Sequence, residues 1–493
     1  MEEKLHQLII SRLNGYEVNS NNYIRKILEL VRRGIGGFII FGGRKNEIKS
    51  LIQEIQSFSE VSLFIASDVE CGVGKQIENA TYFPCQMAIA SAINRNAPAD
   101  VNFFNDILRA ISEELIDIGI NMPLIPVLDI NQNPDNPIIC TRAFSDEPED
   151  VTWFGLSYIK ELESAGLISC AKHFPGHGDT DKDSHISLPV INKTFKEMKE
   201  IDMVPFIEAI KEGVSSIMVG HLNIPSVDSK PASLSRNVIT ELLRKKLGFE
   251  GLVLTDALNM KALKDIKDIS IECIKAGADI LLHPEDVDKT FNELKSAVER
   301  RILTEEEIDR TVNRIMKLKE RIKNIRAWDL KKGEVDYQSH KELSVKLTQM
   351  SITAIKNTGI LPVTDIGRIN VVLAGEKTLF EASPLRAYLK NVFTINEAKK
   401  LGNSIILFAI FTDISAGKRT SGISDREKEK IYSLMKKARN SIVISFGSPY
   451  VLRFFKDADV LIAAYESTEQ AQMAVIKCLK GEADFKGRLP VKI

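Results

Sequence analysis

The sequence predicts an α/β protein in which a (β/α)8 TIM-type barrel is followed by a smaller α/β domain. Its 493 residues exceed what one hydrophobic core normally supports, so two domains are expected. Between about residues 30 and 285, short apolar runs alternate with longer amphipathic stretches, as in parallel strands joined by crossover helices. Polar side chains follow nearly every run, a placement typical of the mouth of a barrel.

Seven apolar runs predict buried strands because they are short and bounded by turn residues. They cover residues 37–41, 61–66, 120–128, 167–171, 216–219, 251–254 and 279–282. No clear run marks the eighth strand, which is inferred from the fold. A doubly wound open sheet is the alternative, but it would gather its ligand-binding groups at one switch point.

The carboxyl ends of these runs carry the candidate functional groups. They are Arg44, Asp68, Glu70, Asp129, Arg142, Lys172, His173, His221, Asp256 and His283. A barrel assembles its active site from loops at the carboxyl ends of different strands, so these side chains are expected to line its mouth.

The rest of the chain predicts a closing helix, a linker and a second domain. Residues 286–330 are charge-rich and helical, with Thr304 as an N-cap before three glutamates. This places the barrel at residues 1–330, a polar linker at 331–340 and an α/β domain at 341–493. Strand-like runs in that domain cover 370–374, 404–411, 441–446 and 460–464.

The composition of the chain indicates which binding partners and which cellular compartment to expect. A formal charge of -1 with 27% charged residues gives no electrostatic reason to expect nucleic acid or an anionic membrane as a partner. The six cysteines lack C-x-x-C spacing, which suits reduced core residues and suggests no zinc site. Neither an export signal nor an apolar run of about 18 residues is found, so a cytoplasmic protein is expected.

The densest chemistry lies in one loop. Lys172-His173-Phe174-Pro175-Gly176-His177-Gly178-Asp179-Thr180, closing with Asp183-Ser184-His185, holds three of the seven histidines. Proline and glycine prevent this stretch from forming a helix or an interior strand. Loops that carry such groups on a rigid scaffold are usually functional.

Four further motifs accompany this loop. They are Pro126-Val127-Leu128-Asp129-Ile130, Asn136-Pro137 with Arg142-Ala143-Phe144, Met218 with Gly220-His221, and Leu254-Thr255-Asp256-Ala257-Leu258-Asn259-Met260. Together the five resemble glycoside hydrolase family 3, in the branch of bacterial β-N-acetylglucosaminidases. Residues 351–362 and 487–491 also resemble the second domain of that family, an α/β sandwich.

The resemblance implies a catalytic set. Asp256 matches the nucleophile that forms a covalent glycosyl-enzyme, and His185 paired with Asp183 matches the acid/base dyad of this branch. From residue type alone, Asp256 could instead cap a helix and His185 could only cap the loop. Neither half-reaction requires a metal or an organic cofactor.

The resemblance also implies a sugar-binding subsite. Its residues are Asp68, Arg142, Lys172, His173 and His221. For Arg142 the alternative is a structural ion pair with Asp129 or Asp146. His177 is expected to hold the loop.

One segment departs from the family pattern. The family commonly continues after the Asp68 position with Gln-Glu-Gly-Gly-Arg-Val, whereas this chain has Val69-Glu70-Cys71-Gly72-Val73-Gly74-Lys75. Val73 replaces the arginine, and Lys75 lacks its planar fork. Subsite contacts and substrate preference could therefore differ.

The predicted function is a retaining exo-β-N-acetylglucosaminidase, a β-N-acetylhexosaminidase, that removes terminal GlcNAc from muropeptides or chitooligosaccharides in cell-wall recycling. Three alternatives remain open: a β-glucosidase or β-xylosidase of the same family, a GlcNAc phosphorylase, and a catalytically weak sugar-binding protein. The sequence does not indicate an oligomeric state.

Overall fold

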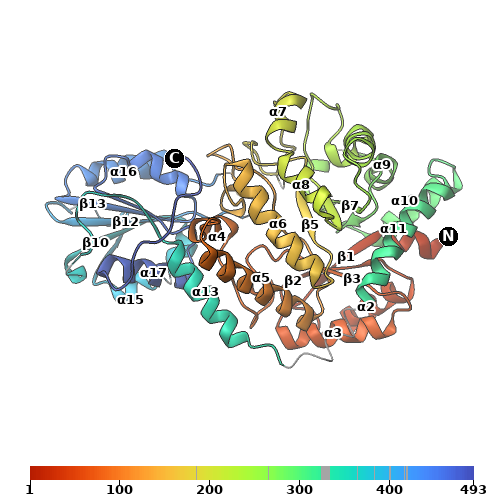
Figure 1. Ribbon diagram of the computed structural model, residues 1–493, viewed down its shortest axis with the longest axis horizontal. Coiled ribbons are helices and arrows are strands. Elements are labelled where there is room, and N and C mark those ends of the chain that lie inside the picture. The colour runs from red at the N-terminus through yellow and green to blue at the C-terminus, as the bar shows by residue number, and fades with distance from the viewer. Residues whose placement is uncertain are drawn as a thin grey trace. The chain divides into compact units, whose positions relative to one another are not determined.

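The computed structural model describes the chain except for residues 185, 265, 324–333, 364, 382, 399–400, 416 and 418–419. The described chain divides into two compact units (Figure 1). Unit 1 comprises Met1–Tyr82, Asn105–Ile130 and Val151–Lys341. Unit 2 comprises Phe83–Phe104, Asn131–Asp150 and Glu342–Ile493. Each unit is therefore assembled from three separate stretches of chain.

Unit 1 is an α/β fold with parallel strands arranged as a curled half-barrel. Its strands are β1 (Ile9–Asn14), β2 (Gly37–Phe41), β3 (Phe64–Ser67), β4 (Met122–Pro123), β5 (Cys170–Phe174), β6 (Ser216–Val219), β7 (Leu252–Thr255) and β8 (Leu281–Leu282). Five form a sheet in the order β4-β3-β2-β1-β8, and three form a sheet in the order β5-β6-β7. All of their pairings are parallel.

Single bridges connect the two sheets. Val127, just after β4, forms a parallel bridge with Lys172 of β5. At the other side, Leu254 of β7 bridges Ile280, the residue before β8, and Thr255 donates a backbone hydrogen bond to the carbonyl of Ile280. The polar residues at the carboxyl ends of β3, β5, β6 and β7 therefore belong to one connected set of strands.

Amphipathic helices cover the strands of unit 1. In α3 (Lys45–Phe58), Ile48, Leu51, Ile52 and Ile55 recur at helical spacing and are all buried. The other helices mainly in this unit are α1 (Glu2–Gln7), α2 (Asn21–Arg32), α5 (Pro98–Ile118), α6 (Pro148–Ser164), α7 (Phe195–Glu200), α8 (Val204–Glu212), the π-helix Asn237–Lys246, α9 (Ile269–Ala276), α10 (Val287–Glu299) and α11 (Glu305–Lys323).

The predicted strands of unit 1 are confirmed with two differences. The runs at 37–41 and 216–219 are strands over the same residues, and the other runs each overlap a strand. The run at 120–128 was wrong in length, because only Met122–Pro123 pairs as a strand and prolines at 123 and 126 lack the N–H of a continuous ladder. The unidentified strand is β1, whose apolar run is interrupted by Ser11 and Arg12.

Unit 2 is built on a six-stranded sheet in the order β11-β10-β12-β13-β14-β9. Its strands are β9 (Thr353–Asn357), β10 (Asn370–Gly375), β11 (Asn391–Thr394), β12 (Ile405–Phe411), β13 (Asn440–Phe446) and β14 (Val460–Ala463). Its helices are α4 (Gln86–Ala92), α13 (Tyr337–Ser351, mostly in this unit), α14 (Lys377–Phe380), α15 (Leu385–Tyr388), α16 (Asp425–Met435) and α17 (Glu469–Lys480). Only β9 runs antiparallel to its neighbour.

Both faces of this sheet are covered. Figure 1 shows α16 on one side and α15 and α17 on the other. Alternate residues of β10, β12 and β13 share a core cluster with apolar residues of α15 and α17, because successive strand side chains point to opposite faces. The four predicted runs of this domain are confirmed as strands; β9 and β11 were not predicted because their residues are only partly buried.

The expected linker at 331–340 is only partly described. Residues 331–333 lie outside the described chain, and α13 begins at Tyr337. Tyr337 donates a hydrogen bond to Asp117, 2.8 Å away, and Nδ1 of His340 lies 2.9 Å from Glu114. The end of the expected linker is therefore helical and joined to α5 within unit 1.

Candidate active site

A buried lysine joins the ends of β3 and β5. Lys172 of β5 is 1% exposed, and its Nζ lies 2.7 Å from Oδ1 of Asp68 and 2.8 Å from Oε1 of Glu70. Both carboxylates follow β3, so they approach the lysine across β4, which lies between the two strands. Such charge-assisted hydrogen bonds fix all three groups. Asp68, about one third exposed, still faces solvent.

Asp129 organises the start of the histidine-rich loop. It is fully buried, and its Oδ2 lies 2.6 Å from Nδ1 of His173. Oδ1 accepts hydrogen bonds from the backbone N–H of His177 at 2.7 Å and of His173 at 3.3 Å. Burial by itself raises the pKa of Asp129, but the charge and hydrogen bond of His173 outweigh it and hold that pKa below its usual value.

This arrangement orients the His173 imidazole. An ionised carboxylate only accepts hydrogen bonds, so Nδ1 of His173 carries the proton. In the described part of the chain, Nε2 has no hydrogen-bond partner. His173 can therefore present Nε2 to a sugar hydroxyl.

His177 makes its contacts inside the loop. Its Nδ1 lies 2.8 Å from the Thr180 hydroxyl and its Nε2 lies 3.3 Å from that of Ser184. Burial lowers the pKa of His177 to about 4, so the ring is neutral near pH 7. This agrees with a role in holding the loop rather than in touching substrate.

The proposed acid/base dyad is only partly described. Asp183 is buried, and its backbone carbonyl accepts hydrogen bonds from Ile186 and Ser187 at 2.9 and 3.1 Å. His185 lies outside the described residues. Farther along, Lys193 binds Asp202 at 2.9 Å and Asp179 at 3.3 Å, which ties the loop to the segment before α8.

Asp256 directly follows β7. Its backbone N–H donates to the carbonyl of Val219 on β6, and its Oδ1 accepts from the N–H of Ala257 at 2.7 Å. The next helical turn starts only at Lys261 and is capped by Met260, so Asp256 is not a helix N-cap. The residue is partly exposed.

His221 lies beneath this carboxylate segment. Its Nε2 donates to the carbonyl of Ala257 at 3.1 Å, and its Nδ1 lies 2.7 Å from the Ser233 hydroxyl. Both ring nitrogens are engaged and the residue is fully buried. The geometry favours positioning of the Asp256 segment over direct contact with a sugar.

Arg142 belongs to unit 2. It ends a 3₁₀ turn (Cys140–Arg142), and its guanidinium donates to the carbonyl of Ile138 at 3.1 Å. The segment after Asp68 lies in unit 1. There Val73 is buried in another 3₁₀ turn (Val73–Lys75), whereas Lys75 is exposed.

Two residues of this site, Glu70 and Asp129, were noted at strand ends but not assigned a role. Their signal was position, since each follows an apolar run, but the sequence does not show which cation each carboxylate binds. Among the described residues, no group of three or more histidine, cysteine or acidic side chains could hold a metal ion. Within the same residues, no helix is long and apolar enough to span a membrane.

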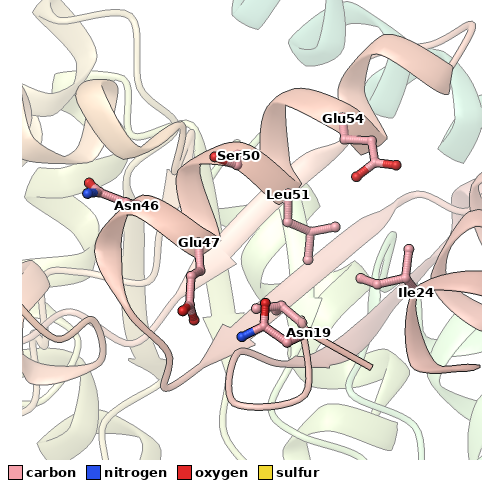
Figure 2. A pocket seen from close by; sticks show the side chains of 8 residues that line it. Asn19, Ile24, Asn46, Glu47, Ser50, Leu51 and Glu54 are labelled. Atoms are coloured by element: carbon pink, nitrogen blue, oxygen red, sulfur yellow. The ribbon is translucent and has the colours of Figure 1, made fainter. Parts of the chain in front are cut away.

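A separate hollow of about 370 Å³ lies between α2 and α3. Figure 2 shows Glu47 and Leu51 extending from α3 toward Asn19 and Ile24, and Asn46, Ser50 and Glu54 of the same helix also line the hollow. None of the predicted site residues lines it.

Comparisons with known proteins identify the family of the chain. Residues 1–318 match the family described as Glycosyl hydrolase family 3 N terminal domain. Beta-hexosaminidase A of Pseudoalteromonas piscicida is 29% identical over 547 residues, which cover 95% of this chain and 91% of that protein. Beta-N-acetylglucosaminidase/beta-glucosidase of Cellulomonas fimi is 25% identical over 508 residues, which cover 93% of this chain and 88% of that protein. The structure of a glycoside hydrolase family 3 beta-N-acetylglucosaminidase from Paenibacillus sp. str. FPU-7 has a TM-score of 0.84 at 27% identity, with 100% of this chain and 98% of that chain covered.

Proposed function

The chain belongs to glycosyl hydrolase family 3 and is a glycoside hydrolase, and from this premise we propose that it is a retaining exo-β-N-acetylglucosaminidase. The named relatives and the Paenibacillus structure support GlcNAc as the sugar. Muropeptides or chitooligosaccharides in the cytoplasm are the proposed substrates. The single observation that carries the proposal is the position of Asp256, a partly exposed residue that directly follows β7 and does not cap a helix.

The proposal includes a closed eight-stranded barrel in unit 1 and an α/β sandwich at 341–493. Closure is supported by the single bridges from Val127 to Lys172 and from Leu254 to Ile280. In a closed barrel, the carboxyl ends of β3, β5, β6 and β7 would share one mouth.

The proposed mechanism has two steps. Asp256 attacks the anomeric carbon while His185 protonates the glycosidic oxygen, which gives a covalent glycosyl-enzyme and a free leaving group. His185 then takes a proton from water, which displaces Asp256. Asp183 fixes the tautomer of His185. Asp68, Lys172 and His173, all in unit 1, bind ring hydroxyls, and His221 positions Asp256.

The nucleophile is tested by Asp256→Ala on an aryl β-GlcNAc, with exposed Asp457→Ala as a control. We expect no measurable turnover from the first variant and wild-type turnover from the second. A fluorinated glycoside that accumulates the covalent intermediate should label the peptide containing Asp256. Near-normal turnover of Asp256→Ala, or a label on another peptide, would refute the assignment.

The acid/base is tested by His185→Gly with two leaving groups. An activated nitrophenolate needs little protonation, whereas a sugar alcohol needs it fully. The variant should therefore lose about 10²- to 10⁴-fold in rate on a disaccharide but much less on the activated aryl glycoside. Equal losses on both substrates would contradict general acid catalysis by His185.

A β-glucosidase activity is the second candidate, because the Cellulomonas fimi relative carries both activities in its name. Aryl GlcNAc and aryl glucoside compared at equal leaving group decide between them. Assays with and without phosphate identify a phosphorylase through the release of sugar 1-phosphate.

A further inference from the structure

Three side chains at the ends of β1, β2 and β8 form a cluster that the mechanism does not use. The guanidinium of Arg12 lies 5.1 Å above the Phe41 ring, and the Phe41 and His283 rings are 5.6 Å apart. Arg12 pairs with Ile39 in register, and Asn14 pairs with Phe41. Because side chains two residues apart share a face of a strand, Arg12 and Phe41 lie on the same face of the sheet.

The cluster lies beside the proposed sugar site. Strand β2 neighbours β3, which Asp68 follows, and β8 is bridged to β7, which Asp256 follows. Arg12, Phe41 and His283 therefore occupy the stretch of strand ends between the proposed sugar-binding aspartate and the proposed nucleophile.

Arg12 presents an available positive charge. It is exposed, and among the described residues it has no carboxylate partner. Asp68, the acid of the neighbouring strand end, is bound to Lys172. A guanidinium on an aromatic face is held by the ring while its edge donors stay open to a ligand.

The third residue of the cluster, His283, has an uncharged imidazole near pH 7. Burial, followed by the charge of Arg12, lowers its pKa to about 4, whereas Asp68 acts in the opposite direction. Its φ of +48° lies in the left-handed region, which costs free energy for a residue other than glycine. Such backbone strain is concentrated at functional sites.

An exposed aromatic ring continues the surface. Tyr16, in the loop after β1, is 66% exposed, and a Cβ added to Gly42 would come within 2.2 Å of its ring. Gly42 thus allows the ring to lie directly on the backbone that follows Phe41. Exposed aromatic faces are suited to packing against sugar rings.

We propose that Arg12, Phe41 and His283 form a subsite for an anionic group, a carboxylate or a phosphate, carried by the saccharide substrate. The inference rests on the proposed function and narrows its substrate class to acidic saccharides. Arg12 supplies the positive charge, and Phe41 holds its guanidinium in place. His283 is uncharged, so Arg12 is the cation of the subsite.

The competing explanation is that Arg12 only offsets the nearby carboxylates. Asp68 and Glu70 share Lys172 as an ion-pair partner, and Arg12 would then add a second positive charge near this pair of carboxylates. In that case Arg12 would support neutral and acidic substrates equally, so the two explanations differ in substrate preference.

A pair of matched disaccharides tests the subsite. GlcNAc-β-1,4-MurNAc differs from chitobiose chiefly by a lactyl carboxylate, and an aryl 6-phospho-β-GlcNAc differs from aryl β-GlcNAc by a phosphate. We expect wild-type kcat/KM to favour the acidic member of one pair, and Arg12→Gln to reduce that preference by about 10- to 100-fold. The affected pair identifies whether the leaving group or the terminal sugar carries the anion.

The controls separate charge, geometry and folding. Arg12→Lys keeps the positive charge but lacks the planar guanidinium, so it should restore part of the preference for acidic substrates. Arg25 is an exposed arginine on α2, and Arg25→Gln should leave that preference unchanged. Equal losses on acidic and neutral substrates, or no loss on either pair, would overturn the subsite.

Failure of the proposed function would appear separately, as no turnover of any GlcNAc substrate by the wild-type protein. Calorimetry on Asp256→Asn, with and without Arg12→Gln, then compares binding of the two disaccharides without turnover. The subsite is supported if the protein binds the acidic disaccharide more tightly than the neutral one and Arg12→Gln abolishes this difference. Equal binding of the two disaccharides overturns it.

Discussion

Asp129 links the buried end of the Val127–Ile130 segment to the loop that carries the proposed chemistry. Its two oxygens hold the His173 ring and two backbone N–H groups, so one carboxylate fixes both the imidazole and the path of the chain. In the interior, where water cannot replace a lost partner, such a shared acceptor is costly to remove.

We predict that Asp129→Asn lowers kcat/KM by about 10- to 100-fold, the loss known for carboxylates that orient metal-bound histidines in the same way. The amide can donate to Nδ1 of His173 and so favour the opposite tautomer. The effect should change the pH profile of kcat/KM, which a purely structural defect would not. Wild-type kinetics in a folded Asp129→Asn protein would contradict this role.

His177 makes stability depend on pH. Its folded pKa of about 4 is below the usual 6.5, so the unfolded chain binds more protons between these values and stability falls as pH drops through that window. One such histidine contributes a slope of up to about 1.4 kcal/mol per pH unit. His283, with the same direction, adds to it.

His177→Gln should therefore flatten the fall in unfolding temperature between pH 6.5 and pH 4.5, even though it lowers stability at pH 7. Thermal unfolding followed by circular dichroism at several pH values measures the slope. Parallel curves for the variant and the wild-type protein would show that His177 does not contribute.

Residue type and position after a strand were enough to predict Asp68, Lys172, His173 and Asp256 as site residues, and their roles stay predictions. The partners were not predictable in this way. His221 was expected to bind sugar, but its ring nitrogens contact Ser233 and Ala257. The orientation of a buried imidazole depends on the tertiary fold around it, and a single sequence does not indicate that orientation.

At the scale of elements, α11 contains an unusual buried cation. Lys319 is 1% exposed, donates to Gln7 at 2.6 Å and lies 5.0 Å from the Phe64 ring. Burial lowers its pKa to about 7. Because the unfolded chain keeps the ordinary lysine value near 10.5, folding releases a proton between pH 7 and 10.5.

The free energy of unfolding should therefore rise with pH between pH 7 and 10.5. Lys319 alone contributes up to about 1.4 kcal/mol per pH unit to this rise. Lys319→Met keeps the length and the packing while removing the charge. We expect a higher unfolding temperature than wild type at pH 7 and a smaller advantage at pH 9. Exposed Lys317→Met on the same helix is the control, and it should change neither value.

The ends of elements show what local sequence can and cannot predict. The expected Thr304 cap is confirmed, since Thr304 and Glu307 exchange reciprocal hydrogen bonds. Strand β1 was missed because Arg12 interrupts its apolar run, and that residue is the one we assign to ligand binding. Functional residues weaken the very patterns from which strands are predicted.

At the scale of the whole molecule, unit 2 depends on three distant stretches of chain. Within it, the N–H of Cys85 donates to Glu466 at 2.8 Å, Asn131 donates to the Tyr450 hydroxyl at 2.9 Å, and Ser145 donates to the carbonyl of Pro490 at 2.6 Å. The sequence indicated a second domain but not these contributions, because short non-repetitive segments show no sign of the core they join.

A chain that ends at Lys341 should therefore be insoluble or aggregated. It would retain Phe83–Phe104 and Asn131–Asp150 but lose the stretch Glu342–Ile493, which completes their unit and holds their hydrogen-bond partners Glu466, Tyr450 and Pro490. Gel filtration and binding of a hydrophobic dye, compared with the full chain, measure the effect. A monomeric truncated protein with one cooperative unfolding transition and no dye binding would contradict the expectation.

The divided origin of unit 2 also sets an order of events during translation. At about 5–20 residues per second, the roughly 240 residues between Phe104 and Glu342 occupy the ribosome for about 12–48 s. During that interval the buried apolar residues of α4, such as Met87 and Ile89, lack the stretch Glu342–Ile493 that completes their unit. Nascent chains of this protein should therefore depend on chaperones that shield early hydrophobic segments until synthesis is complete.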